Sequence, residues 1–254
     1  MEKIYNDIIS FLREYQQDTN CKGYVIGVSG GKDSTVVAKL LCDAIGKANI
    51  LGVLMPNGNQ KDIGYSHAVC AELGIDHMTV NINDNVYDIR DYIENAWIDD
   101  SEGNSKNQYI AVTEQAMFNV PPRIRMTILY AIAQSMGYRV AGTGNKSEAY
   151  IGWCTKWGDM ASDINPIAHL TCTQVIELGH YLCLPEYMVN KVPADGLTDR
   201  SDEDNFGFSY ADLDEHIMGT HSEYSDAKVE AEIEKKHRSA HHKSAPYTMN
   251  HLWK

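Results

Sequence analysis

One stretch of this 254-residue sequence constrains its fold more than any other. Residues 23–45 read GYVIGVSGGKDSTVVAKLLCDAI, a short apolar run followed by a glycine-rich turn and then by a segment with the length and apolar spacing of a helix. Glycine lets the chain turn sharply and lets backbone amides approach a ligand without a side-chain clash. The stretch therefore predicts a buried strand that passes through a tight turn directly into a helix.

The same alternation of apolar runs and helical patterns continues along the chain. Alternating buried strands and helices are typical of an α/β fold, a doubly wound parallel sheet flanked by helices. Because ligands bind at the carboxyl ends of strands in such sheets, the loops after Val28, Met55 and Ala141 should share one crevice. The predicted segments are residues 50–56, 77–82 and 138–145 for further strands, and residues 1–17, 64–74 and 121–137 for helices.

The remaining segments complete a chain that we expect to form a single domain, since it shows no internal repeat and no linker. Residues 107–118 predict another helix, residues 191–210 a loop, and the residues from Ser225 a charged helix. Thr171 and Gln174 have the capping-box spacing of a helix start. An apolar stripe within 121–137 indicates either a core helix or a dimer interface. The stripe consists of Ile124, Ile128, Leu129 and Ile132.

Composition excludes some classes of partner. The hydrophobic content of 43% and charged content of 22% are ordinary for a globular protein, and no run of 18 apolar residues predicts a membrane span. A formal net charge of -13 disfavours nucleic acid and anionic membranes, although local cations or a metal can still hold an anionic substrate. Six cysteines without a C-x-x-C pair, and no export signal, predict reduced thiols in a cytoplasmic protein.

The glycine-rich turn differs from a Walker phosphate loop, in which a hydroxyl residue directly follows the lysine. Here Gly27 and Gly31 are one residue too close, and Asp33 stands between Lys32 and Ser34. Backbone amides at the helix start can still bind a phosphate, helped by the helix dipole. Asp33 would repel a phosphate by itself, but it suits a magnesium ion that bridges carboxylate and phosphate oxygens. The alternative is a plain turn in which Asp33 caps the helix.

The string SGGKDS resembles the PP-loop of ATP pyrophosphatases, which split ATP between the α and β phosphates. Three later blocks, NVPPRIRMTILYAIAQ, GTGNKSEAYIGWCTKWGDMASDINPIAHLT and DEDNFGFSYADLD, resemble the NAD synthetase family in order and spacing. The resemblance implies an ammonia-dependent ligase that amidates nicotinic acid adenine dinucleotide to NAD through an adenylated carboxylate, releasing AMP and pyrophosphate. It also implies Mg2+ as cofactor, ATP as co-substrate, a homodimer, and a mobile C-terminal loop around residues 238–254.

The resemblance also assigns roles to individual residues. Asp33 and Glu148 match the magnesium carboxylates, and the predicted catalytic residues are Asp33, Lys156 and Asp163. Lys156 and Asp163 match groups at the nicotinic acid end, where Asp163 would orient ammonia or accept its proton. The predicted ATP-binding residues are Gly27, Val28, Ser29, Gly30, Gly31, Lys32, Asp33, Ser34, Met55, Thr143, Cys172 and Ala194. The predicted substrate-binding residues are Arg123, Lys156, Asp163, His242 and Lys243.

Two positions depart from the family pattern, and two other functions stay open. Many relatives carry lysine where this chain has Cys172, and serine or threonine where it has Ala194. A tRNA-modifying PP-loop enzyme is one alternative, against which stand the net charge and the lack of a C-x-x-C motif. A non-catalytic sensor of adenine nucleotides is the other, although it would not need the acidic and basic site residues together. Arg125 is expected either to contact substrate or to pair with an acid on its own helix.

Overall fold

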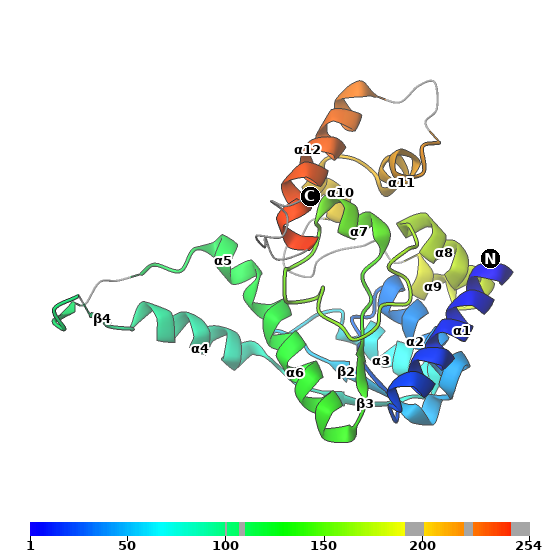
Figure 1. The fold of residues 1–254 in the computed structure, drawn as a ribbon, viewed down its shortest axis with the longest axis horizontal. Coiled ribbons are helices and arrows are strands. Elements are labelled where there is room, and N and C mark those ends of the chain that lie inside the picture. Colours follow the sequence, from blue (N-terminus) through cyan, green and yellow to red (C-terminus); the bar gives the residue numbers. More distant parts are fainter. Residues whose placement is uncertain (100, 107–109, 191–200, 221–225, 245–254) are drawn as a thin grey trace.

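A four-stranded sheet with the order β3-β2-β1-β6 forms the centre of the molecule, and every neighbouring pair is parallel (Figure 1). The computed structural model describes residues 1–99, 101–106, 110–190, 201–220 and 226–244. With helices on both faces of the sheet, the predicted doubly wound α/β fold is confirmed. The strands are β1 (Tyr24–Gly27), β2 (Ile50–Leu54), β3 (Asp76–Thr79) and β6 (Arg139–Ala141).

Two layers of helices cover the sheet because side chains along a strand alternate between its faces. Tyr24 and Ile26 of β1 pack into the layer that contains α1, α2 and α8. Val25 and Val53 pack on the opposite face with α4 and α6. The helices on these faces are α1 (Glu2–Thr19), α2 (Lys32–Ile45), α3 (Ile63–Leu73), α4 (Asn83–Glu94), α6 (Val120–Met136), α8 (Cys172–Tyr181) and α9 (Glu186–Val189), and a short 3-10 helix η1 (Lys47–Asn49) follows α2.

A third apolar cluster joins the C-terminal helices to the body. Its buried members include Ile151 of α7, Phe206 of α10, Leu213 of α11 and Ile233 of α12. Figure 1 shows α11 and α12 projecting from the body beyond α7. These elements are α7 (Lys146–Ile151), α10 (Asp202–Phe206), α11 (Tyr210–Met218) and α12 (Ala227–Ser244).

The structure corrects three segment predictions. Of the helix expected over residues 107–118, residues 107–109 lie outside the described part, and residues 110–118 hold only α5 (Glu114–Phe118), which Thr113 caps by accepting a hydrogen bond from the Ala116 N–H. The expected loop at 191–210 contains α10, which Ser201 caps through a capping box, while residues 191–200 lie outside the described part. Residues 238–244 of the expected C-terminal loop are helical and belong to α12.

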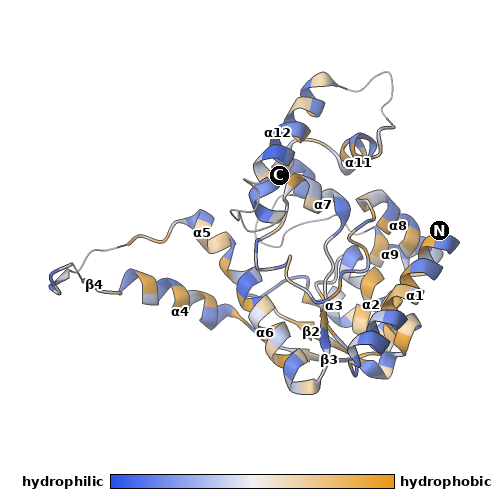
Figure 2. Cartoon of the chain, viewed as in Figure 1, coloured by the Kyte–Doolittle hydropathy of each residue, from blue (hydrophilic) through white to orange (hydrophobic). Residues whose placement is uncertain are grey.

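An arm extends away from the body at the left of Figure 1, made of α4, α5 and a small antiparallel sheet of β4 (Ile98–Asp99) and β5 (Ser105–Lys106). Apolar residues recur along α4 in Figure 2, and Tyr87, Tyr92 and Trp97 are 63–69% exposed. Such exposed aromatic side chains mark a surface suited to protein contact. Within the described residues, no helix combines the length and apolar character needed to cross a bilayer.

Helix α12 docks on the end of α7 with almost no space between the two backbones. Gly152, the C-cap of α7, has a φ of +68°, and a Cβ built there would lie 2.5 Å from the Cβ of Ala240. The rings of Tyr150 and His237 stack at 3.9 Å, and His216 of α11 bonds Glu234 of α12 at 3.1 Å. Gly152 is therefore required both by its backbone conformation and by the approach of α12.

Replacing Gly152 by alanine should loosen α12. We expect Gly152→Ala to lower the free energy of unfolding by about 1–3 kcal/mol more than a matched control does, because the new methyl group overpacks the helix contact. Gly219→Ala is the control, since Gly219 caps α11 with a φ of +66° and a Cβ there would meet nothing within 4 Å. Urea unfolding and limited proteolysis within α12 measure the effect. Equal losses in both variants would contradict the proposed close approach.

Candidate functional site

The predicted site residues gather where strands β1 and β6 lie side by side. In the strand order β3-β2-β1-β6, the chain adds β2 and β3 on one side of β1 and later adds β6 on the other side. The boundary between β1 and β6 is therefore the topological switch point of the sheet. The PP-loop follows β1, and residues 142–145 follow β6. The Asn145 side chain crosses this boundary, since its Nδ2 donates to Asp33 Oδ1 at 3.0 Å. The loops after Val28 and Ala141, two of the three that the sequence predicts to share a crevice, are thus joined by a side-chain hydrogen bond.

The PP-loop is held in a defined shape by its own polar groups. Ser29 Oγ accepts a hydrogen bond from the Gly31 N–H at 3.2 Å, and the hydroxyls of Ser29 and Ser34 are 3.1 Å apart. Gly30 has a φ of +77°, and a Cβ there would lie 2.8 Å from the backbone nitrogen of Ser66. Any larger residue would strain this turn. The loop therefore presents the N-terminus of α2 as a preformed anion site.

Two carboxylates face each other across the switch point. Glu148 Oε2 accepts from the Asn145 N–H at 3.0 Å, and Asn145 Oδ1 accepts from the Glu148 N–H at 2.9 Å, a capping box that begins α7. Burial, and next the charge of Asp33, raise the pKa of Glu148 to about 8. Neighbouring carboxylates with this mutual repulsion favour a shared cation.

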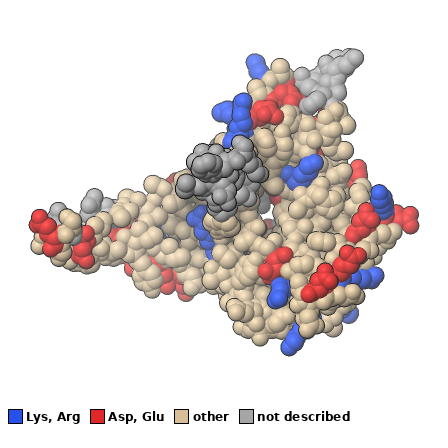
Figure 3. All heavy atoms as spheres, viewed as in Figure 1, with Lys and Arg blue, Asp and Glu red and all other residues tan. Residues whose placement is uncertain are grey.

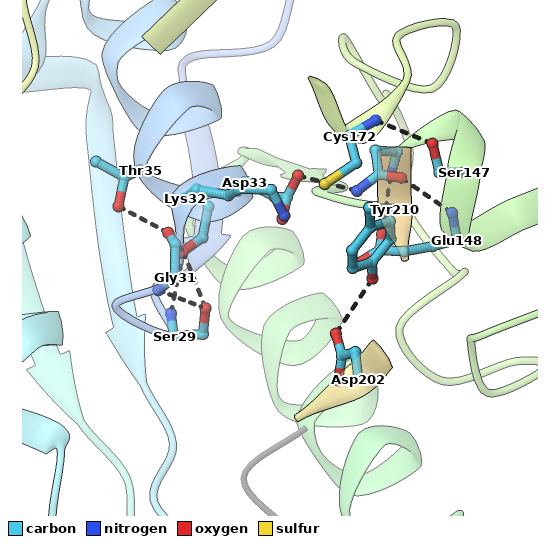
Figure 4. Close-up of polar contacts among 12 residues, drawn as sticks. Ser29, Gly31, Lys32, Asp33, Thr35, Ser147, Glu148, Cys172, Asp202 and Tyr210 are labelled. Carbon is cyan, nitrogen blue, oxygen red and sulfur yellow. Dashed lines mark hydrogen bonds and ion pairs between the residues drawn. The ribbon is translucent and has the colours of Figure 1, made fainter. Parts of the chain in front are cut away.

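Lys32 supplies such a cation in the structure. Its ammonium lies 2.8 Å from Asp33 Oδ2 and its side chain is 3% exposed (Figure 4). Burial alone would lower the pKa of Lys32, but the charge of Asp33 and the electrostatic effect of its other neighbours outweigh burial and raise it. The Tyr210 ring lies under the ammonium, with 5.4 Å between Nζ and the ring centroid. Lys32 is therefore a buried, permanently charged member of the site.

Cys172 lies beside Lys32 and is itself buried. Its backbone N–H donates to Ser147 Oγ at 2.9 Å, and burial raises the pKa of its thiol to about 12 (Figure 4). The position that carries lysine in many relatives thus holds a neutral thiol next to a lysine supplied by the PP-loop. Ala194, the other departure from the family pattern, lies outside the described residues.

The donor set fits a magnesium ion that arrives with a nucleotide. Among the described residues, no group of three or more His, Cys, Asp or Glu side chains could hold a metal alone. Mg2+ usually binds through one or two carboxylates together with substrate phosphates. Asp33 and Glu148 provide two carboxylates at the mouth of an anion-binding turn, which matches this mode of binding.

Arg123, Lys156, His242 and Lys243, four of the five predicted substrate-binding residues, lie in a second group. Arg123 Nε donates to the Lys156 carbonyl at 3.3 Å, and Lys156 Nζ donates to the His242 carbonyl. Lys243 Nζ donates to the carbonyls of Gly152 and Cys154 at 2.7 and 2.8 Å. Residues from α6, from the turn after α7 and from the end of α12 therefore meet in one place.

Asp163 occupies a different position from this group. Its Oδ2 accepts from the Val140 N–H at 2.8 Å, and its own N–H donates to the Val140 carbonyl at 3.0 Å. It thereby completes the hydrogen bonding of the edge strand β6. Burial, and next the charge of Asp163, raise the pKa of Tyr15 in α1 and of Tyr130 in α6. Asp163 is therefore close to both helices.

Asp159 is an acid at the substrate group that the sequence reading missed. Its carboxylate accepts from the Thr155 N–H at 2.6 Å. Desolvation raises its pKa, while the charge of Lys243 opposes that shift. Asp159 and Asp163 both occur in the block KWGDMASD, and spacing alone could not decide between them. The structure distinguishes them through the turn that begins at Thr155, since its N–H bonds the Asp159 carboxylate.

The remaining predictions are placed as follows. Arg125 Nε donates to the Met55 carbonyl at 3.0 Å, a contact that the sequence did not predict, and burial lowers its pKa. Met55 is 8% exposed at the end of β2. Thr143 is half-buried in the turn after β6, where Asn165 Nδ2 fixes the Gly144 carbonyl at 2.9 Å.

Comparison with known proteins gives one consistent family. The family model described as NAD synthase matches residues 4–248. An NH(3)-dependent NAD(+) synthetase of Thermococcus sibiricus is 36% identical over 214 residues, covering 84% of this chain and 78% of that protein. Among solved structures, an NMN synthetase from Francisella tularensis superposes with a TM-score of 0.85 at 29% identity, covering 98% and 97% of the two chains. An NH3-dependent NAD synthetase from Campylobacter jejuni, in complex with nitrate, gives 0.78 at 26% identity and covers 98% of each.

The Lys32–Cys172 contact predicts a charge conflict. Cys172→Lys would place a second ammonium beside the buried Lys32 side chain. Because two like charges would then be buried together, the variant should lower the free energy of unfolding by about 3 kcal/mol. Adding Lys32→Met should recover at least about 1 kcal/mol, because it removes the repulsion. Urea unfolding of the single and double variants measures this coupling. Strict additivity would show that the two side chains do not interact.

The pKa of Glu148 predicts a pH dependence of stability. Its pKa in the folded protein is about 8, above the ordinary 4.5, so its contribution is fully present at low pH and is lost as pH rises through about 8. Without metal or nucleotide, the melting temperature should fall between about pH 5 and about pH 9. Glu148→Gln should flatten that fall, because the amide still accepts from the Asn145 N–H. An unchanged profile would mean that another group causes the fall.

Proposed function

The chain belongs to the NAD synthase family, and on this premise we propose that it amidates nicotinic acid adenine dinucleotide with ammonia, using ATP, to form NAD. The observation that carries the proposal is the bond between Asn145 and Asp33, because it joins the PP-loop to the turn that holds Glu148. This junction places an anion-binding turn and two carboxylates at one point. The ligase activity follows from the family, whereas the dinucleotide substrate and the adenylated intermediate are part of the proposal.

In the first half-reaction, the nicotinate carboxylate attacks the α-phosphorus of ATP. A new bond joins a carboxylate oxygen to that phosphorus, the bond to the β-phosphate oxygen breaks, and pyrophosphate leaves. Ser29, Ser34 and the amides at the start of α2 would hold the β and γ phosphates. Mg2+, held by Asp33 and Glu148, would supply positive charge against the phosphate oxygens. Lys32 adds a fixed cation close to the same oxygens.

In the second half-reaction, ammonia attacks the carbonyl carbon of the adenylated carboxylate. A carbon–nitrogen bond forms, AMP leaves, and the attacking nitrogen loses a proton. We propose that Asp159 accepts this proton, because it lies in the substrate group and its raised pKa favours proton binding. Asp163, for which the sequence predicted that role, has its carboxylate engaged with the Val140 N–H.

The second group of residues would bind the dinucleotide. The substrate is anionic, and Arg123, Lys156 and Lys243 bring three cations to one place. Lys156 and Lys243 donate to backbone carbonyls in the structure, and phosphate or carboxylate oxygens of the substrate are stronger acceptors. His242 would contribute through the same end of α12.

A second candidate substrate is nicotinic acid mononucleotide. The observation that favours it is the similarity to the Francisella tularensis NMN synthetase, with a TM-score of 0.85. The chemistry at the carboxylate would be identical. The two candidates differ only in whether the adenosine half of the dinucleotide contributes to binding.

We propose that the enzyme works as a homodimer in the cytoplasm. The arm supports the dimer, because Tyr87, Tyr92 and Trp97 are exposed on it. The predicted stripe on α6 supports the core-helix alternative instead, since Ile124, Ile128, Leu129 and Ile132 pack against the apolar cluster around Val25 and Val53. Six free cysteines support a reducing compartment. On the described part of the face in Figure 3, basic side chains lie in separate groups without a continuous stripe, which favours no nucleic-acid partner.

One assay tests the proposed function. Purified protein with ATP, Mg2+, ammonium and the dinucleotide should form NAD and pyrophosphate in equal amounts. The mononucleotide in place of the dinucleotide tests the second candidate, through the ratio of the two kcat/KM values. Tight ATP binding without pyrophosphate release would favour the sensor, and product formation only with tRNA would favour the modifying enzyme.

The two acids of the KWGDMASD block give a matched pair of variants. Asp159→Asn should reduce NAD formation by about 100-fold or more while pyrophosphate release falls less, because the proton acceptor acts after adenylation. Asp163→Asn should mainly lower stability, since the amide can no longer offer a charged acceptor to the Val140 N–H. Product ratios and melting temperatures separate the two effects. If Asp163→Asn reduced NAD formation more than pyrophosphate release, and Asp159→Asn lowered only stability, the catalytic role predicted for Asp163 from the sequence would be restored.

A further inference from the structure

Both oxygens of the Asp33 carboxylate are already occupied in the structure. Oδ1 accepts from Asn145 Nδ2 at 3.0 Å, and Oδ2 lies 2.8 Å from the Lys32 ammonium (Figure 4). The side chain of Asp33 is 17% exposed and that of Lys32 only 3%. A cation that the chain itself carries therefore sits on the carboxylate that the proposed function assigns to magnesium.

The Lys32 ammonium is enclosed by groups that keep it there. The Tyr210 ring lies 5.4 Å below it, and the Tyr210 hydroxyl donates to Asp202 Oδ2 at 3.2 Å, which fixes the ring. The other charged or titratable groups around it are Glu148 and the Cys172 thiol. Since burial and Asp33 raise the pKa of Glu148 to about 8 and that of the Cys172 thiol is raised to about 12, Asp33 is the anion with which Lys32 forms an ion pair among the described residues.

We propose that Lys32 is an internal counter-ion that makes metal binding depend on nucleotide. Without ATP, its ammonium holds Asp33 and opposes a divalent cation at the same carboxylate. When ATP binds, its phosphates offer the ammonium new acceptors, and Asp33 becomes available to the metal. The inference rests on the proposed function, which places Mg2+ at Asp33 and Glu148.

The physical basis is repulsion between like charges in a poorly solvated site. A divalent cation at Asp33 would lie next to an ammonium that cannot move into water, because the Lys32 side chain is buried. The triphosphate brings enough negative charge to neutralise both cations. Metal and nucleotide therefore bind cooperatively, and the coupling acts equally in both directions.

The test measures each ligand without the other. Mn2+ serves as the metal probe and its binding to nucleotide-free protein is followed by electron paramagnetic resonance. ATP binding is measured by calorimetry in the presence of EDTA. Lys32→Met keeps the length of the side chain and removes its charge. Lys39→Met is the matched control, because Lys39 pairs with Asp43 at 2.6 Å on the same helix, away from the site.

The proposal predicts opposite shifts in the two measurements. Lys32→Met should bind Mn2+ about tenfold or more tightly than the unaltered protein, because a neighbouring positive charge is gone. The same variant should bind metal-free ATP about tenfold or more weakly, because the phosphates lose a cation. Lys39→Met should change neither value. A general folding defect would weaken both ligands, so it cannot produce this pattern.

A second pair of variants keeps the proposal testable if Lys32→Met does not fold. Tyr210→Leu removes the ring under the ammonium and should tighten Mn2+ binding to nucleotide-free protein, because Lys32 is held less firmly on Asp33. Tyr210→Phe keeps the ring and should retain the original Mn2+ affinity.

Unchanged or weaker Mn2+ binding by Lys32→Met would overturn the proposal, as would tight Mn2+ binding by the unaltered nucleotide-free protein. These outcomes are independent of the proposed function, which fails only if no NAD or pyrophosphate forms in the complete assay. If no variant bound Mn2+ while NAD was still produced, the counter-ion proposal would be wrong and the proposed ligase activity would be supported.

Discussion

The hydrogen bond from Asn145 to Asp33 is the contact on which the rest of the site depends. Asn145 is fully buried, begins α7 through a capping box with Glu148, and reaches across the switch point to the first turn of α2. One side chain thereby fixes the distance between two loops that come from different halves of the sheet. The PP-loop holds its own shape through the contact between the Ser29 and Ser34 hydroxyls and through Gly30, whose φ is +77°. What Asn145 adds is the relative placement of this loop and the second carboxylate.

Charge balance explains how a protein with a net charge of -13 can handle two anionic substrates. The cations of the site come from separate elements: Lys32 from the start of α2, Arg123 from α6, and Lys156 and Lys243 from the turn after α7 and the end of α12. Each is bound to an acceptor in the structure, either a carboxylate or a backbone carbonyl. In the proposed function, these cationic side chains would exchange their present acceptors for the phosphates and carboxylate of the substrates, which are stronger acceptors than backbone carbonyls.

The sequence predicted the fold well because strand–helix alternation is a local signal. The PP-loop, the capping box at Thr171 and the meeting of Arg123, Lys156, His242 and Lys243 follow from motifs whose parts are close in sequence or carried by the resemblance. What the sequence could not predict has physical causes. It does not reveal that the Asp159 carboxylate bonds the Thr155 N–H while the Asp163 carboxylate bonds the edge strand at Val140. The extents of α5 and α12 depend on a cap at Thr113 and on packing against Gly152, which composition does not reveal.

Cys172 shows why a motif position cannot be interpreted alone. From the sequence alone, Cys172 is a departure from the family pattern. In the structure it is the neutral neighbour of a buried lysine, and two lysines could not lie side by side there without strong repulsion. The cation at this place is Lys32, the first residue of α2. Because its ammonium lies 2.8 Å from Asp33 Oδ2, it ties the charge of the site to the carboxylate to which the proposed function assigns the metal.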